Sequence, residues 1–239
     1  MKIAVVVPTY NERENIKLLI QKIFKIFNKE KINGEVIVID DSSDDGTAKE
    51  VKKLQNKFSV ILIERKRKLG LGSAYIEGFK NAIKSNADII FQMDADLSHK
   101  PEDIPKFLEK INSGYDMVIG SRRINHGRFA TKSKLRKFIS ITGNFFGRYI
   151  AGIDLSDISS GYRAYHRRIF DRIKLEKIES SGYEFQLEIL ARVKREGFNI
   201  SEVPIVFRDR YKGKSKLSPL HIMRFILIAL KIRFNFLRN

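Results

Sequence analysis

Short, largely apolar segments that alternate with amphipathic ones constrain the fold of this chain more than any other feature. Continuous apolar runs of this length predict strands that are buried on both faces, as happens in parallel sheets. The expected strands are Ile3–Val7, Val36–Ile39, Val60–Ile63, Asp88–Met93 and Met117–Ile119. Because amphipathic segments separate them, we expect an α/β fold with a mostly parallel sheet that is covered by helices on both faces.

Four of the intervening segments have the signals of helices. Asn11 is predicted to cap the first, in which apolar residues recur at helical spacing as far as Phe27. A second helix is expected over Thr47–Lys57, a third after the turn at Gly70–Gly72, and a fourth that Pro101 opens. With no internal repeat or Pro/Gly-rich linker between these elements, a single main domain is favoured.

Acidic residues lie just beyond three of the predicted strands. Glu12 follows the first strand, Asp40 and Asp41 follow the second, and Asp94 and Asp96 follow the fourth. In an open α/β sheet, ligands bind outside the carboxyl ends of the strands, so these acids are expected to converge at one edge. Alternating carboxylates can flank Mg²⁺ or Mn²⁺, which in turn bridges the phosphates of a nucleotide. A single acid can equally cap the next helix, but three such positions favour a binding site.

Composition excludes several other classes of protein. The chain has no cysteine and only four scattered histidines, which argues against zinc and disulfides and favours a reducing, intracellular compartment. Met1–Pro8 has too short an apolar run for a signal peptide and is predicted to be the first strand. Within Leu220–Leu237 the longest uncharged run is Phe225–Leu230, far below the ~20 residues of a membrane span. We therefore expect no transmembrane helix.

The net charge of +18 is concentrated in two parts of the chain. Met117–Ile153 contains eight Lys or Arg and no acid, and the residues after Asp209 contain eight more, again without an acid. Such a surplus indicates a polyanionic partner, either nucleic acid, anionic lipid or a phosphorylated substrate. In the first stretch the cations interleave with aromatic and aliphatic residues, which predicts an amphipathic helix in contact with lipid or core.

Seven sets of residues carry a family resemblance. Three of them, Val7–Glu12, Ile39–Thr47 and Met93–His99, resemble the successive signatures of inverting family-two glycosyltransferases with the GT-A fold. The later sets resemble dolichol-phosphate (polyprenol-phosphate) mannosyltransferases: Gly120–Arg122, Ser159–Arg163, Gly182–Gln186 and Phe207–Leu217. Each motif alone is weakly specific, but together they run in order through nearly the whole chain.

The resemblance implies a role for each matching position. Residues that would bind the nucleotide sugar are Pro8, Thr9, Tyr10, Glu12, Asp40, Asp41, Asp94, Ala95 and Asp96. The metal would be held by Asp94, Asp96 and Ser98, although many relatives have Gln at the last position. Catalytic roles would fall to Asp96, Arg122, Arg210 and Lys216, and the acceptor phosphate would contact Arg122, Arg136, Arg210 and Lys216.

The reaction implied is inverting transfer of mannose from GDP-mannose to dolichyl or polyprenyl phosphate, with Mg²⁺ or Mn²⁺ as cofactor. A lipid phosphate is already an anionic nucleophile, so it needs arginines to bind it rather than a general base to activate it. Residues 1–217 would be the catalytic domain, with 122–152 as its basic acceptor and interface segment. Residues 218–239 would form an amphipathic helix. We expect peripheral attachment to an anionic membrane surface on its cytoplasmic face, and the resemblance allows a small membrane-anchoring subunit.

Several alternatives remain at this stage. A polyprenyl-phosphate glucosyltransferase that uses UDP-glucose has the same chemistry and differs only in the sugar and base. A basic nucleic-acid-binding protein would explain the charge, but no RNA-binding or helix-turn-helix signature is present and the strand-end acids would have no role. A nucleotidyltransferase would usually have a Gly-rich loop after the first strand, and Pro8–Glu12 contains no glycine.

Overall fold

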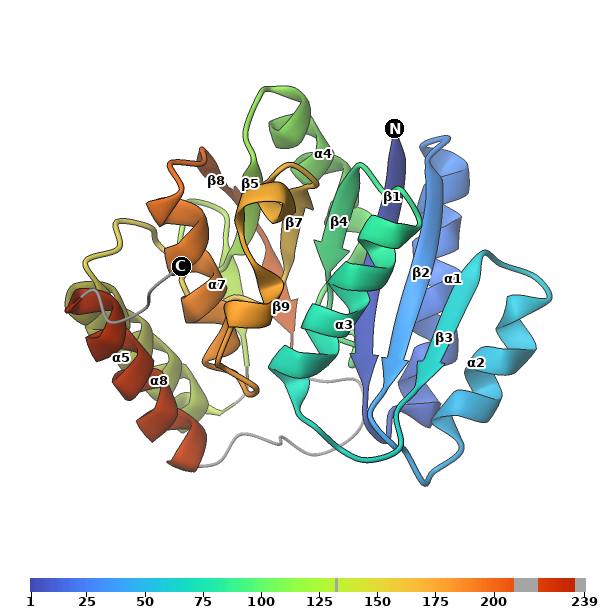
Figure 1. The fold of residues 1–239 in the computed structure, drawn as a ribbon, viewed down its shortest axis with the longest axis horizontal. Coiled ribbons are helices and arrows are strands. Elements are labelled where there is room, and N and C mark those ends of the chain that lie inside the picture. Colours follow the sequence, from blue (N-terminus) through green and yellow to red (C-terminus); the bar gives the residue numbers. More distant parts are fainter. Residues whose placement is uncertain (132, 209–218, 235–239) are drawn as a thin grey trace.

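A seven-stranded sheet runs through the molecule with helices on both faces (Figure 1). The computed structural model describes residues 1–131, 133–208 and 219–234. The strands are β1 (Lys2–Thr9), β2 (Asn33–Asp40), β3 (Val60–Glu64), β4 (Ile89–Gln92), β5 (Met117–Ser121), β7 (Arg163–His166) and β8 (Ile200–Pro204). Their order is β3-β2-β1-β4-β7-β5-β8, and only β7 is antiparallel to its neighbours. The predicted mostly parallel sheet is confirmed.

The helices divide between the two faces of this sheet. Their bounds are α1 (Arg13–Lys29), α2 (Thr47–Gln55), α3 (Leu71–Lys84), α4 (Ile104–Asn112), α5 (Lys134–Ala151), α6 (Ile169–Arg172), α7 (Phe185–Arg195) and α8 (Pro219–Arg233). Two 3₁₀ turns, η1 (Pro101–Asp103) and η2 (Leu175–Lys177), complete the set. Residues of α1, α2 and α4 share one core cluster, and residues of α3, α7 and α8 share the other.

Alternation along β1 shows why the strands are apolar throughout. Val5 and Val7 join the core under α1, whereas Ala4 and Val6 join the core under α3, and all four are fully buried. Both faces of each central strand are therefore covered, as in other parallel sheets. Gly78 lets α3 lie directly on β1, because a Cβ there would be 2.1 Å from Cγ1 of Val6.

One predicted helix cap was wrong. The N-cap of α1 is Glu12, while Asn11 lies one residue earlier with a φ of +55°. Its side-chain oxygen accepts a hydrogen bond from the backbone N–H of Asp44 at 3.2 Å, so it joins the two loops after β1 and β2 instead. Asparagine tolerates the left-handed conformation better than most residues, which suits this position.

A second, two-stranded parallel sheet lies at the carboxyl edge of the large one. It pairs β6 (Arg128–Ala130) with β9 (Val206–Arg208), and the backbone N–H of Arg208 bonds to the carbonyl of Ser98 at 3.3 Å. Helices α5 and α8 pack against each other at one end of the molecule (Figure 1). In the described part of the chain, no helix has both the length and the apolar character to cross a bilayer.

Candidate active site

A pocket of about 320 Å³ opens where β1, β2 and β4 end. All but one of the residues expected to bind a nucleotide sugar line it: Pro8, Thr9, Tyr10, Glu12, Asp41, Asp94, Ala95 and Asp96. Asp40 is the exception. It is buried, and its carboxylate accepts hydrogen bonds from the hydroxyls of Thr9 at 2.8 Å and Ser43 at 2.6 Å. Asp40 therefore holds the loop that follows β2, and of the two acids Asp41 is the one that lines the pocket.

The Asp41 carboxylate organises the wall of the pocket as well as lining it. It accepts hydrogen bonds from Nη1 of Arg65 at 3.1 Å and from the backbone N–H groups of Leu69 and Gly70 at 2.8 and 2.9 Å. Gly70 has a φ of +98°, and a Cβ there would lie 2.6 Å from the carbonyl oxygen of Ser181. Only glycine allows this loop to approach the turn before α7 so closely.

An aromatic ring and two cations complete the pocket. The Lys68 ammonium lies 3.7 Å from the centroid of the Tyr10 ring, and both residues line the pocket. Arg224 lines it from α8. An aromatic face suits a nucleobase and nearby cations suit phosphates, so the lining combines the two kinds of group that a nucleotide needs.

The acid pair after β4 is held by buried neighbours. Oδ1 of Asp94 accepts a hydrogen bond from the Tyr75 hydroxyl at 2.9 Å, and the Asp94 backbone N–H donates to Nδ1 of His99 at 3.2 Å. Burial raises the pKa of Tyr75 well above 10, with the Asp94 charge adding to it, so the phenol stays a donor. Asp96 is buried, and its Oδ1 accepts from the backbone N–H of Ser98 at 3.0 Å.

These residues fit a hard divalent cation better than zinc. Within residues 1–131, 133–208 and 219–234, no group of three or more His, Cys, Asp or Glu could hold a metal ion. Asp94 and Asp96 could hold a cation in the way that Mg²⁺ is bound, through one or two carboxylates together with substrate phosphates and water. The Ser98 hydroxyl is buried with no hydrogen-bond partner among the described residues, so it is available as a further oxygen ligand.

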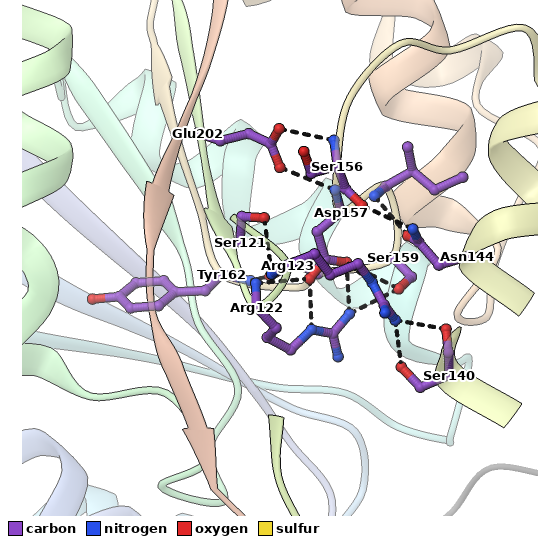
Figure 2. A network of polar contacts seen from close by, with 12 residues as sticks. Ser121, Arg122, Arg123, Ser140, Asn144, Ser156, Asp157, Ser159, Tyr162 and Glu202 are labelled. Carbon is purple, nitrogen blue, oxygen red and sulfur yellow. Dashed lines mark hydrogen bonds and ion pairs between the residues drawn. The ribbon is translucent and has the colours of Figure 1, made fainter. Parts of the chain in front are cut away.

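Arg122, at the end of β5, is the centre of a second polar cluster (Figure 2). Its Nε and Nη2 donate to the two oxygens of Asp157 at 2.6 and 2.7 Å, its backbone N–H donates to the same carboxylate at 3.1 Å, and Nη2 also reaches the Ser159 hydroxyl. The guanidinium carbon lies 5.4 Å from the ring centroids of both Phe129 and Phe207. Arg122 is thus fixed between two rings by a bidentate ion pair.

The electrostatics of this pair follow from its burial. Burial acts to raise the pKa of Asp157, but the charge and hydrogen bonds of Arg122 outweigh it and lower the pKa from 3.8 to about 2. Burial likewise acts to lower the pKa of Arg122, and Asp157 outweighs it, so the pKa is raised. Both groups are therefore charged over the physiological range of pH.

Helix α5 is tied to the same cluster. Nη2 of Arg123 donates to the Ser140 carbonyl at 2.6 Å and to its hydroxyl at 2.9 Å. Asn144 donates to the Ser156 carbonyl at 2.8 Å, and Figure 2 shows Glu202 of β8 accepting from the backbone of the 156–157 turn on its other side. Arg122, the turn that holds it and α5 are thus one connected unit.

A second cavity, of about 700 Å³, lies beside this cluster and carries several positive charges. Its cationic lining residues are Arg122, Arg123, Arg128 and Lys137. Strands β4 and β5 are parallel to each other, because both are antiparallel to β7, so this cavity and the acidic pocket lie at the same edge of the sheet. Arg136 lies near the start of α5, whereas Arg210 and Lys216 fall outside the described residues.

Several residues at the site were missed from sequence. Tyr75 and Lys68 have no local sequence pattern that marks them, apart from their place near Gly70–Gly72. Asp157 was missed because it lies just before the Ser159–Arg163 motif and not within it. Arg163 itself is fully buried and donates to three backbone carbonyl groups, so it supports the fold rather than the pocket. The Nδ1 of His99 accepts a hydrogen bond from the backbone N–H of Asp94, in the acid pair.

A mostly parallel sheet covered on both faces, with an acidic nucleotide-sized pocket at its carboxyl edge, defines the class of GT-A glycosyltransferases. Residues 4–174 match the family described as Glycosyl transferase family 2, and the chain belongs to that family. It is 39% identical over 219 residues to the undecaprenyl-phosphate mannosyltransferase of Micrococcus luteus, which covers 91% of this chain and 88% of that protein. It is 36% identical to the polyprenol monophosphomannose synthase of Mycolicibacterium smegmatis, over 91% of this chain and 82% of the other.

Solved structures agree on the fold. Glucosyl-3-phosphoglycerate synthase from Mycobacterium tuberculosis in complex with uridine diphosphate superposes with a TM-score of 0.70 at 19% identity, over 98% of this chain and 80% of that chain. Its complex with Mg²⁺ and uridine diphosphate gives the same TM-score over 98% and 79%. At this level of identity the likeness shows the fold, and it confirms the GT-A architecture.

Proposed function

We propose that this protein is an inverting mannosyltransferase that moves mannose from GDP-mannose to dolichyl or polyprenyl phosphate. The observation that carries the proposal is the pairing of an acidic nucleotide pocket with an arginine-rich cavity at the same edge of the sheet. Two mannosyltransferases that act on polyprenyl phosphates, by their names, align with nine-tenths of the chain, which supports the same acceptor and sugar here.

The donor would lie in the pocket lined by Tyr10, Asp41 and Asp94, with its base against Tyr10 and its diphosphate toward Asp94 and Asp96. A bound Mg²⁺ or Mn²⁺ would stabilise negative charge on the departing nucleoside diphosphate. Solved complexes of the M. tuberculosis synthase contain Mn²⁺ or Mg²⁺ together with UDP-glucose or uridine diphosphate, which supports this choice of metal. Lys68 and Arg224 would add positive charge at the same pocket.

The acceptor phosphate would bind in the arginine-rich cavity. Arg122 commits Nε and Nη2 to Asp157 and Ser159, so Nη1 is the part of its guanidinium left for a phosphate oxygen. Because the phosphate is an anion at neutral pH, it can attack the anomeric carbon without a general base. Attack opposite to the leaving diphosphate would give a β-linked product from an α-linked donor. A product with the α configuration would contradict this mechanism.

We place the acceptor end of the molecule at the cytoplasmic face of a membrane. Helix α5 exposes Phe138, Phe145, Phe146 and Tyr149, each more than half accessible. Beside it, Met223 of α8 and Phe234 just after α8 are exposed to a similar extent. The stretch from Met117 to Ile153 carries eight cations and no acid, which suits anionic head groups. Peripheral binding would then be tested by flotation with anionic liposomes at low salt, and protein that stays wholly unbound would contradict it.

The reaction is tested by release of nucleotide from purified protein with Mg²⁺. GDP-mannose and UDP-glucose are compared, each with and without a polyprenyl phosphate in detergent. Release from GDP-mannose that requires the lipid and is lost in Asp96→Ala is the expected result. Lipid-dependent release from UDP-glucose instead would keep the mechanism and change the sugar. Release from neither donor would refute the assignment of the arginine-rich cavity to a phosphate acceptor.

A further inference from the structure

His99 lies between the two halves of the site although it lines neither pocket. Its ring is 1% exposed and stacks on Tyr162, with centroids 5.0 Å apart and planes 20° from parallel. Its Nδ1 accepts the backbone N–H of Asp94 at 3.2 Å, and Nε2 lies 3.9 Å from the Asp94 carboxylate. The bond requires an unprotonated Nδ1, so the ring presents an acceptor on one side only.

The same ring also contacts a residue of the acceptor half. The His99 and Phe207 rings meet edge to face with centroids 5.5 Å apart, and Phe207 in turn lies beside the Arg122 guanidinium at 5.4 Å. The backbone adds a parallel link, since the Arg208 N–H bonds to the carbonyl of Ser98. A short chain of contacts therefore runs from Asp94 through His99 and Phe207 to Arg122.

We propose that His99 is a positioning residue with two separable functions: its Nδ1 fixes the Asp94 backbone in the donor motif, and its ring fixes β9 beside Arg122. The inference rests on the proposed function for the roles of donor and acceptor, but its geometry does not. A donor motif held only by its own turn could move relative to Arg122. The shared histidine keeps the two sides at a constant separation, which an attack between two bound phosphate compounds requires.

Two substitutions separate the two functions. His99→Phe keeps a ring for Tyr162 and Phe207 but leaves the Asp94 N–H without its acceptor. His99→Asn places an amide oxygen near the position of Nδ1 but removes the ring. A matched control is His166→Phe, because Nδ1 of His166 also accepts a backbone N–H, that of Arg168, at 3.2 Å. His166 pairs with Ile89 at the start of β4, the end of the sheet away from the pocket.

Binding of GDP with Mg²⁺ is measured by calorimetry, and the KM for polyprenyl phosphate by nucleotide release. His99→Phe should weaken metal-dependent GDP binding about tenfold, the effect of one lost hydrogen bond, with little change in the lipid KM. His99→Asn should bind GDP nearly as the wild type does and raise the lipid KM several-fold. His166→Phe should change neither.

Amide hydrogen exchange of the unliganded enzyme supplies a readout that does not depend on the reaction. Exchange of the 94–99 segment should accelerate in His99→Phe and stay close to wild type in His99→Asn. Equal losses in both variants on every measurement, or no change in either, would overturn the inference while leaving the proposed function standing. Failure of the wild type to bind GDP or UDP would refute the proposed function, and the exchange pattern alone would then decide the role of His99.

Discussion

Replacing Asp157 by Asn should destabilise the protein in a way that depends on pH. The carboxylate is fully buried. Burial acts to raise its pKa, but Arg122 outweighs this effect, and the pKa is lowered from 3.8 to about 2. At about 1.36 kcal/mol per pKa unit, the ionised group contributes roughly 2.5 kcal/mol to the free energy of unfolding. Because the pKa is lowered on folding, this contribution is complete above about pH 4 and is lost as the pH falls toward 2.

Urea unfolding of both proteins at pH 7 and pH 3 measures this effect. At pH 7 the Asn variant should be less stable by at least roughly 2.5 kcal/mol, since Arg122 is left with a neutral partner in a buried site. At pH 3 the difference in stability should shrink by about 1 kcal/mol. At that pH Asp157 is mostly protonated in the unfolded wild type but still mostly ionised in the folded protein, so the wild type loses part of its advantage. A difference that is the same at both values, or smaller than about 0.5 kcal/mol, would refute this account of the ion pair.

A nearby acid provides the control. The Asp154 side chain is fully exposed and lies 3.5 Å from Arg148, so Asp154→Asn should unfold at the same urea concentrations as the wild type at either pH.

The Asp157→Asn variant should also bind the lipid phosphate less well. With Arg122 no longer held at two points, the KM for the lipid phosphate should rise while nucleotide binding stays the same.

Four further variants test the pocket and α5. Asp96→Asn should reduce Mg²⁺-dependent binding of GDP at least tenfold in calorimetry, with little effect on thermal unfolding. Lys68→Met should weaken GDP binding and make it less sensitive to salt, because the ammonium above Tyr10 supplies positive charge at the pocket. Gly143→Ala should stabilise the protein by about 1 kcal/mol in urea unfolding, as nothing lies within 4 Å of the added Cβ and alanine favours helix. Gly147→Ala should instead destabilise it, since its Cβ would lie 2.6 Å from an aromatic carbon of α8.

The first half of the fold was predictable because local pattern and burial agree there. Short apolar runs such as Val36–Ile39, bounded by turn signals, are typical of strands covered on both faces, and the structure extends that one to Asn33–Asp40. The strand β7 could not be found in the same way. Its sequence, Arg163–His166, has no apolar run, and it becomes a strand because β4 and β5 flank it and supply partners on both sides. Such long-range pairing leaves no local signal.

The site was predictable to the level of strand ends but not of single side chains. Neighbouring residues of an extended chain point in opposite directions. Asp40 and Asp41 therefore have different surroundings, although both are aspartates that follow the same predicted strand. Arg122 was predicted as a phosphate ligand, but no local pattern indicates that its Nε and Nη2 already donate to Asp157, which lies 35 residues further on. Burial and partner choice of this kind are properties of the folded state.

The ion pair between Arg122 and Asp157 changes how the arginine-rich cavity would bind a phosphate. A bidentate carboxylate offsets most of the positive charge of Arg122, so this residue adds little long-range attraction for an anion and mainly sets the position of one donor. Attraction must come from cations with no such partner in the described structure, of which Arg128 and Lys137 line the cavity. Arg123 lies between these extremes: its guanidinium is hydrogen-bonded to Ser140 of α5, and burial lowers its pKa. Arg122 would therefore position the phosphate, whereas Arg128 and Lys137 would attract it. Helix α5, which is tied to the Arg122 cluster, is also the helix that exposes several aromatic side chains.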